Sequence, residues 1–272
     1  MCSMSSSAGL RNGSTPTVLL VHGAFADASS WAGVIAQLQT AGIEAVAPAN
    51  PLRGLNSDAR YIASVAEEVD GPTMLVGHAY GGAVITVAAA LPSNVVGMVY
   101  VTAFALDEGE SVLDVSTRFP DGLLTPALRP AVCPGGDGGS IVELYIDRDA
   151  FPTVFAADLS ADVAAVAAAT QRPIAAAAFE DRASAAAWKT LQCWYVVATA
   201  DRVIHPDAQR FMAARAAARV LEVDASHAIP TSQPELVANQ IHKAALTPAE
   251  PAKREPFQAT TPVIGHTESE LT

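Results

Sequence analysis

The sequence predicts an α/β fold, in which a mostly parallel sheet of about six strands carries helices on both faces and is interrupted by an insertion. Short apolar runs alternate with helical segments over residues 17–102 and again over 193–245. The connections between runs are long enough for the right-handed crossovers that join parallel strands. This alternation is absent from about residue 107 to residue 187, which indicates an insertion between the two parts of the sheet.

The expected strands are short continuous runs rich in Val, Leu and Ile. Such runs are typical of strands that helices cover on both faces. These strands are expected over residues 17–22, 43–48, 73–76, 95–102, 193–198 and 219–223.

The expected helices begin at capping residues and end at Gly or Pro. Ser29 or Ser30 can cap the first, Ser57 the second, and Pro206 suits the first position of the helix before the last strand. Gly42 provides a C-terminal stop for the first helix. These core helices are expected over residues 30–40, 58–69, 82–90, 206–217 and 234–245.

The insertion is predicted to be a mostly helical cap. Residues 120–140 contain several Pro and Gly and are expected to form a loop. The expected cap helices span residues 148–155, 159–170, 174–180 and 184–189. The resulting domain organisation is a flexible leader (1–15), a core (16–106 and 188–246), the cap (107–187) and a tail (247–272).

The composition points to a globular protein and restricts its partners. The chain has 272 residues, of which 50% are hydrophobic, so it can bury a sizeable core. The net charge of −12 argues against nucleic acid or an anionic membrane as the main partner. The three Cys show no metal-ligand spacing and are expected to be free thiols. The sequence shows no secretory signal and no apolar run long enough to cross a bilayer, so a cytoplasmic location is expected. No metal or cofactor is expected.

The third expected strand runs into Gly77-His78-Ala79-Tyr80-Gly81 and then into an Ala-rich helix. Gly-x-x-x-Gly between a strand and a helix is the layout of a nucleophile elbow, the sharp turn that presents a serine in α/β-hydrolases. Here the serine position holds Ala79. The elbow is therefore predicted, but its nucleophile is missing.

An acid and a histidine follow the last two strands of the expected sheet. Asp201 comes directly after the fifth strand and His227 after the sixth. The order nucleophile position, acid, histidine is the order of α/β-hydrolases, and it predicts that His227 is a general base oriented by Asp201. Asp207 and Asp224 are alternative acids, but Asp207 lies at a helix start and Asp224 could be a supporting partner of His227.

The loop after the first strand, Gly23-Ala24-Phe25, falls at the same edge of the sheet. The N–H groups of Ala24 and Tyr80 are candidates for an oxyanion hole, worth about 3 kcal/mol each in a transition state. Phe25 and Tyr80 can line the pocket or form its wall. His78 and His22 are expected to be structural or pocket-lining. His205 is expected on the surface and Cys193 in the core.

These motifs resemble those of a known family. Five segments resemble α/β-hydrolases of the plant methylesterase and hydroxynitrile-lyase type and their bacterial esterase relatives. These segments are residues 21–31, 77–82, 151–173, 194–204 and 226–235. The resemblance covers about residues 17–245. It implies six parallel strands under a helical cap and Ser-His-Asp hydrolysis of a small carboxylic ester.

Carried over residue by residue, the resemblance places Ala79 at the nucleophile, His227 at the base and Asp201 at the acid. Ala24 and Tyr80 take the positions of the oxyanion donors. The lyase branch typically has Thr where Gly23 stands and Lys where Ala228 stands. Because neither is present, the resemblance favours an esterase over a lyase.

Ala79 removes the covalent step and is expected to cost a factor of about 10⁴–10⁶ in rate. Ser226 and Thr102 fall near the expected site, but neither lies on the elbow. The chain is then an engineered Ser-to-Ala variant of an esterase, which the completeness of the other parts favours, or a natural pseudo-hydrolase that binds small molecules, or an enzyme that uses the His227–Asp201 pair alone for lyase or cofactor-free chemistry. The expected partner is a small-molecule ester, and both a monomer and a homodimer are compatible with the sequence.

Overall fold

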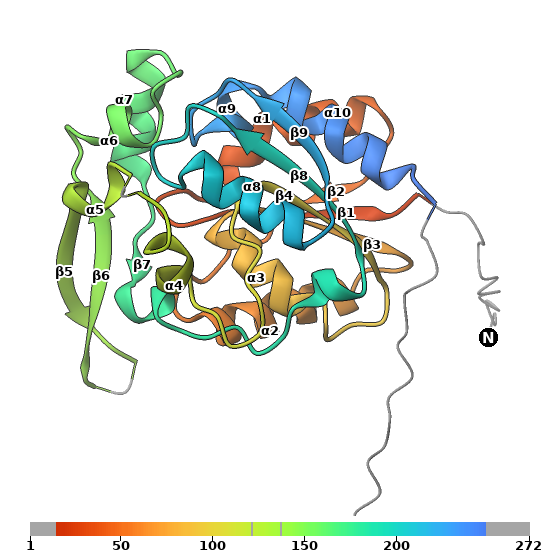
Figure 1. Ribbon diagram of the computed structural model, residues 1–272, viewed down its shortest axis with the longest axis horizontal. Helices are drawn as coiled ribbons and strands as arrows, with labels where there is room; N and C mark the ends of the chain where they lie inside the picture. Colours follow the sequence, from red (N-terminus) through yellow and green to blue (C-terminus); the bar gives the residue numbers. More distant parts are fainter. Residues whose placement is uncertain (1–14, 121, 137, 249–272) are drawn as a thin grey trace, which may run out of the picture.

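The computed structural model describes residues 15–120, 122–136 and 138–248. It contains a six-stranded sheet in the order β2-β1-β3-β4-β8-β9, in which every neighbouring pair is parallel (Figure 1). The predicted α/β fold is thereby confirmed. The strands are β1 (Thr17–Val21), β2 (Ala45–Val46), β3 (Thr73–Ala79), β4 (Val95–Ala103), β8 (Gln192–Ala198) and β9 (Arg219–Val223).

Helices cover both faces of the sheet and divide the core in two. Alternate residues of β1 point to opposite faces, so Val18 and Leu20 belong to one apolar cluster while Leu19 and Val21 belong to the other. The first cluster includes residues of α1 (Ala32–Thr40) and α10 (Pro234–Ala245). The second includes residues of α2 (Leu55–Glu67), α3 (Tyr80–Ala88) and α8 (Pro206–Arg215).

Several element boundaries differ from the predicted ones. Asp27, and not Ser29 or Ser30, caps the short 3₁₀ helix η1 (Ala28–Trp31) that precedes α1, because its carboxylate accepts the Ser29 N–H at 2.7 Å. Strand β2 has only two residues and pairs with β1 alone, at one edge of the sheet. In contrast, β3 runs three residues further than predicted and ends at Ala79.

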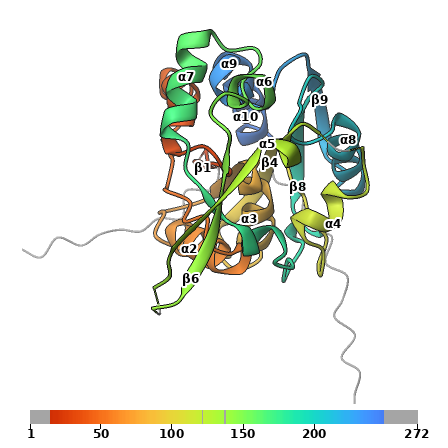
Figure 2. The same ribbon diagram turned by 90° about the vertical axis from the view of Figure 1, so that its left-hand side faces the viewer.

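The insertion, residues 107–187, contains a second sheet, so its interpretation as mostly helical is wrong for residues 128–146. Strands β5 (Leu128–Pro134) and β6 (Ser140–Ile146) form an antiparallel hairpin to which β7 (Ile174–Ala175) adds a short third strand (Figure 2). Pro130 and Pro134 suggested a loop, but β5 is an edge strand, where Pro is tolerated.

The helices of the insertion are short, except for α7. Residues 148–155 and 184–189 form little more than one turn each, and residues 174–180 form β7 followed by a 3₁₀ turn. The insertion lies beyond the ends of the strands of the main sheet (Figure 1). Its helical elements are α4 (Val112–Ser116), α5 (Leu124–Ala127), α6 (Phe151–Val154), α7 (Ala161–Thr170), η2 (Ala176–Phe179) and η3 (Ala187–Lys189).

The predicted leader and tail lie almost wholly outside the described residues, which include Thr15 of the leader and Thr247 and Pro248 of the tail. Among the described residues, no helix combines the length and the apolar character needed to cross a membrane.

Helix α3 packs directly on β1, and Gly81 makes this approach possible. A Cβ atom at Gly81 would lie 2.3 Å from the carbonyl oxygen of Val21. We therefore expect Gly81→Ala to lower the free energy of unfolding by about 3 kcal/mol, since the backbone must move to relieve the overlap. Chemical denaturation measures this loss. Gly136→Ala is the control, because a Cβ there meets nothing within 4 Å; equal losses in the two variants would contradict the packing argument.

Candidate active site

Ala79 occupies a strained turn between β3 and α3. Its backbone has φ 51° and ψ −122°, a conformation that costs a non-glycine residue about 1–3 kcal/mol. The flanking glycines permit the turn, since a Cβ at Gly77 would lie 2.6 Å from the carbonyl oxygen of Gly81. The Ala79 side chain is buried, with 5% of the residue exposed. The geometry is that expected of an elbow, with the methyl side chain of alanine at the turn.

The structure brings the predicted acid and histidine together. The His227 Nδ1 atom lies 2.8 Å from the Asp201 Oδ2 atom, and both side chains are buried. Asp201 follows β8 and His227 follows β9, as the sequence predicts. Of the two alternative acids, Asp207 pairs with Arg210 on the surface of α8.

The Asp201 carboxylate is held by four further donors that the sequence did not identify as a set. Its Oδ1 atom accepts the N–H groups of Val203 at 2.7 Å and Ile204 at 3.1 Å. Its Oδ2 atom accepts the Thr102 hydroxyl and, at 3.0 Å, the side-chain amide of Gln209. Together with His227, these donors hold the buried carboxylate in one orientation.

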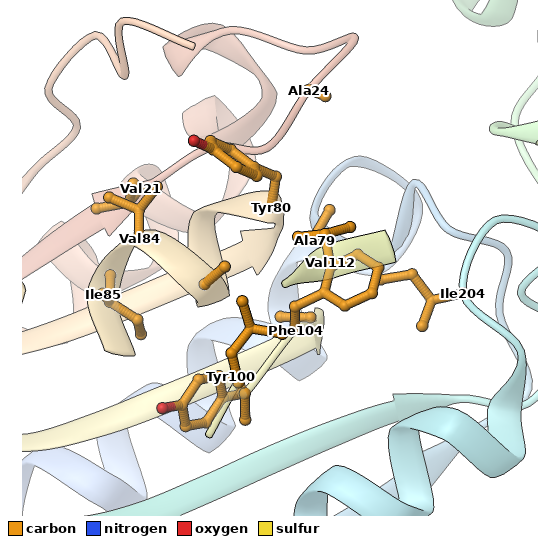
Figure 3. Packing of buried hydrophobic residues seen from close by; sticks show 14 of the residues in the cluster. Val21, Ala24, Ala79, Tyr80, Val84, Ile85, Tyr100, Phe104, Val112 and Ile204 are labelled. Atoms are coloured by element: carbon orange, nitrogen blue, oxygen red, sulfur yellow. The ribbon is translucent and has the colours of Figure 1, made fainter. Parts of the chain in front are cut away.

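The loop after β1 lies against the elbow (Figure 3). A Cβ built on Gly23 would lie 2.6 Å from the Ala79 Cβ and 3.2 Å from the Tyr80 nitrogen, so this loop passes directly beside the nucleophile position. Ala24 follows and is buried. The N–H of Phe25 donates to the carbonyl of Arg172 at 2.9 Å, which ties the loop to the insertion.

Residues 18–240 match the profile described as Alpha/beta hydrolase family. The chain belongs to this family. A search among curated proteins finds no match.

Several proteins of known structure share this fold. A pyrethroid hydrolase from Sphingobium faniae JZ-2 is 21% identical with a TM-score of 0.70, and the alignment covers 86% of this chain and 98% of that one. A polyneuridine aldehyde esterase is 17% identical with a TM-score of 0.74, covering 85% and 100%. A methylesterase from Arabidopsis is 16% identical with a TM-score of 0.68, covering 84% and 98%. At these identities the similarity establishes the fold, and the neighbours are esterase-like.

The Tyr80 side chain contacts a buried acid that the sequence analysis did not find. Its hydroxyl donates to the Asp58 Oδ2 atom at 3.0 Å, and its ring meets Phe179 of the insertion edge-on at 6.4 Å. The Asp58 carboxylate also accepts the N–H groups of Arg53 and Gly54. Burial raises the pKa of Asp58 and that of the Tyr80 hydroxyl. Because Tyr80 opens α3, this contact fixes the first turn after the elbow.

Two buried histidines, His78 and His22, lie next to residues of the site. The His78 Nε2 atom donates to the carbonyl oxygen of His227 at 2.8 Å, and the two rings lie 4.8 Å apart. The His22 Nε2 atom accepts the N–H of Asn50 at 3.0 Å, next to Gly23. Burial lowers the pKa of His22 and lowers that of His78 well below its usual value, with the neighbouring His227 as a second cause. Both contacts suit positioning roles.

Ser226 and His205 make contacts that the sequence did not predict. The Ser226 hydroxyl donates to Asp158, so it is engaged away from the elbow. His205 does not merely lie on the surface, because its side chain accepts the Asp207 N–H and caps α8. Cys193 is buried in β8, as predicted for a core residue. Within the described ranges, no group of three or more His, Cys, Asp and Glu residues could hold a metal ion.

A cavity of about 370 Å³ lies beside the site. Its wall includes Phe25, Phe155 and Ala228, and the Phe155 ring meets the His227 ring edge-on at 4.8 Å. Apart from Ala26, the other apolar residues of its lining belong to the insertion. Asp27 and Asp162 are the charged residues in the lining, which contains no Lys or Arg.

The two buried histidines predict a loss of stability in mild acid. Both have lowered pKa values in the folded state, so the unfolded chain takes up their protons first as the pH falls below about 6.5. Each should therefore cost about 1 kcal/mol of unfolding free energy between pH 7.5 and pH 5.5. Denaturation at the two pH values measures the difference in unfolding free energy. The range ends at pH 5.5 because the raised pKa of Asp58 makes the unfolding free energy change in the opposite direction in more acidic solution.

In His78→Gln about half of this difference should disappear, since the amide can still donate to the His227 carbonyl but does not titrate. An unchanged difference in this variant would show that His78 is not one of the groups responsible.

Proposed function

We propose that this protein has the site of a serine-type hydrolase of small, hydrophobic carboxylic esters. With Ala79, the chain would bind an ester but would not form an acyl-enzyme. The observation that carries the proposal is the buried His227–Asp201 pair, with its 2.8 Å contact, at the same sheet edge as the elbow. A histidine oriented by a carboxylate is the arrangement that removes a proton from a serine hydroxyl.

Each part of the reaction has a residue in this arrangement. A hydroxyl at position 79 would attack the ester carbonyl, and the His227 Nε2 atom would take its proton and pass it to the leaving alcohol. Asp201 would hold the Nδ1 tautomer and stabilise the imidazolium. The N–H groups of Ala24 and Tyr80 would donate to the oxyanion, and the N-terminus of α3 favours negative charge there.

The cavity supports a neutral, apolar substrate. Aromatic and aliphatic side chains dominate its lining, while carboxylates and no basic groups are present. An ester with a carboxylate at its far end would meet Asp27 or Asp162 without a compensating cation. The names of the structural neighbours, a pyrethroid hydrolase and a methylesterase among them, agree with ester substrates.

We further propose that Ala79 stands in place of a serine, as in a Ser-to-Ala variant of an active enzyme. The strained backbone at this position has a cost that a nucleophile justifies and that a binding protein does not need. A second candidate function is chemistry by His227 alone as the base, which the intact His227–Asp201 pair would permit.

Ala79→Ser should create esterase activity on short-chain p-nitrophenyl and aryl methyl esters, with a gain of about 10⁴-fold or more over the Ala79 chain. The reason is that the hydroxyl restores the covalent step to an otherwise complete site. Spectrophotometric assays of purified protein measure the gain.

The matched control is the double variant Ala79→Ser with His227→Ala, which should return to the background rate. Absence of any gain in Ala79→Ser would refute the esterase. Activity of the Ala79 chain that is lost in His227→Ala alone would instead support chemistry by the His227–Asp201 pair.

A further inference from the structure

Strand β4 contains a bulge directly opposite the elbow. On β3, His78 pairs with Val101 and Ala79 pairs with Ala103, so Thr102 is skipped in the register. Thr102 also has φ 39°, in the left-handed region where a β-branched residue is an outlier. Bulges next to active sites commonly redirect one side chain. The side chain redirected here is that of Thr102.

The Thr102 hydroxyl reaches the acid of the site. Thr102 is fully buried, and its Oγ1 atom donates to the Asp201 Oδ2 atom. The same carboxylate oxygen receives the His227 Nδ1 atom at 2.8 Å. Thr102 therefore contacts the oxygen that orients the histidine, and its hydroxyl is committed to that contact instead of being available as a nucleophile.

The other donors to Asp201, apart from His227, come from its own neighbourhood in the chain. Val203 and Ile204 lie in the connection from β8 to α8, and Gln209 lies in α8 itself. Thr102, in contrast, belongs to β4, which pairs with β3 over its length up to the elbow. Among the described residues, it is the donor that connects the acid to the strand beside the nucleophile position.

We propose that Thr102 is a positioning residue, whose hydroxyl is directed by the β4 bulge and fixes the Asp201 carboxylate toward His227 at a set distance from the elbow. Without this hydroxyl the remaining donors come from the segment that follows Asp201 and from His227, and the carboxylate can rotate or shift relative to Ala79. The role in catalysis rests on the proposed esterase function, whereas the effect on the His227–Asp201 contact does not.

The first test uses the full chain with Ala79 and needs no activity. The variant Thr102→Val keeps the shape and removes the hydroxyl. In ¹H–¹⁵N spectra, the His227 Nδ1–H resonance should move or be lost to solvent exchange, and Thr102→Ser should restore it. Thr86→Val is the control, because Thr86 is equally buried and its hydroxyl contacts Gly82 and Tyr100 only.

The inference would be overturned if the His227 Nδ1–H resonance changed no more in Thr102→Val than in Thr86→Val. A general loss of stability would affect both variants and is thereby separated from positioning.

The second test repeats these substitutions in the Ala79→Ser background. Thr102→Val should lower kcat by about 10-fold to 100-fold with little change in KM, since Thr102 is fully buried and does not line the cavity, whereas the base is misplaced. Thr102→Ser should recover most of kcat, and Thr86→Val should retain it. An unchanged kcat in Thr102→Val would refute the proposed role. If Ala79→Ser itself is inactive, the proposed esterase function fails, and the spectra still decide whether Thr102 positions Asp201.

Discussion

The close crossing of α3 over β1 and β3 is the constraint on which the rest of the site depends. At Gly81 and Gly77 the backbones approach so closely that any Cβ would overlap a main-chain oxygen or carbon. This approach accompanies the positive-φ conformation of residue 79, at the junction of β3 and α3. The β1 loop can pass beside Ala79 only because position 23 is also glycine. The scaffold, and not the identity of residue 79, thus sets the geometry.

Around this turn, buried polar groups hold each other in place without buried cations. Asp201 is saturated by backbone, amide, hydroxyl and imidazole donors, and Asp58 by backbone N–H groups and the Tyr80 hydroxyl. Each of these groups would be costly if one partner were removed, because a buried carboxylate cannot recover its hydration. The positive φ values of Ala79 and Thr102 add about 1–3 kcal/mol of strain each. The main effect of this network is therefore to fix one arrangement of the buried polar groups, and its contribution to the stability of the fold is smaller.

Sequence reasoning identified what depends on chain order and missed what depends on register. Asp201 and His227 were predictable because the carboxyl ends of parallel strands meet at one edge. The contacts of Thr102 and Asp58 were not, because a bulge in β4 and a partner 22 residues away leave no local pattern. The β5–β6 hairpin was missed because its Pro residues are typical of loops, and only its place at a sheet edge makes them compatible with a strand.

The same distinction explains how an alanine can occupy the elbow while the rest of the site stays assembled. No hydrogen bond described above involves the side chain of residue 79; the acid, histidine and loop are held by β4, β8, β9 and the insertion. In the proposed esterase, a hydrogen in place of a hydroxyl at this position would remove the nucleophile without releasing any of its partners. The turn also keeps its strain, because glycine contacts on both sides impose it. The assembly of the site therefore does not depend on the side chain of residue 79, and under the proposed function the chemistry would depend on a single oxygen there.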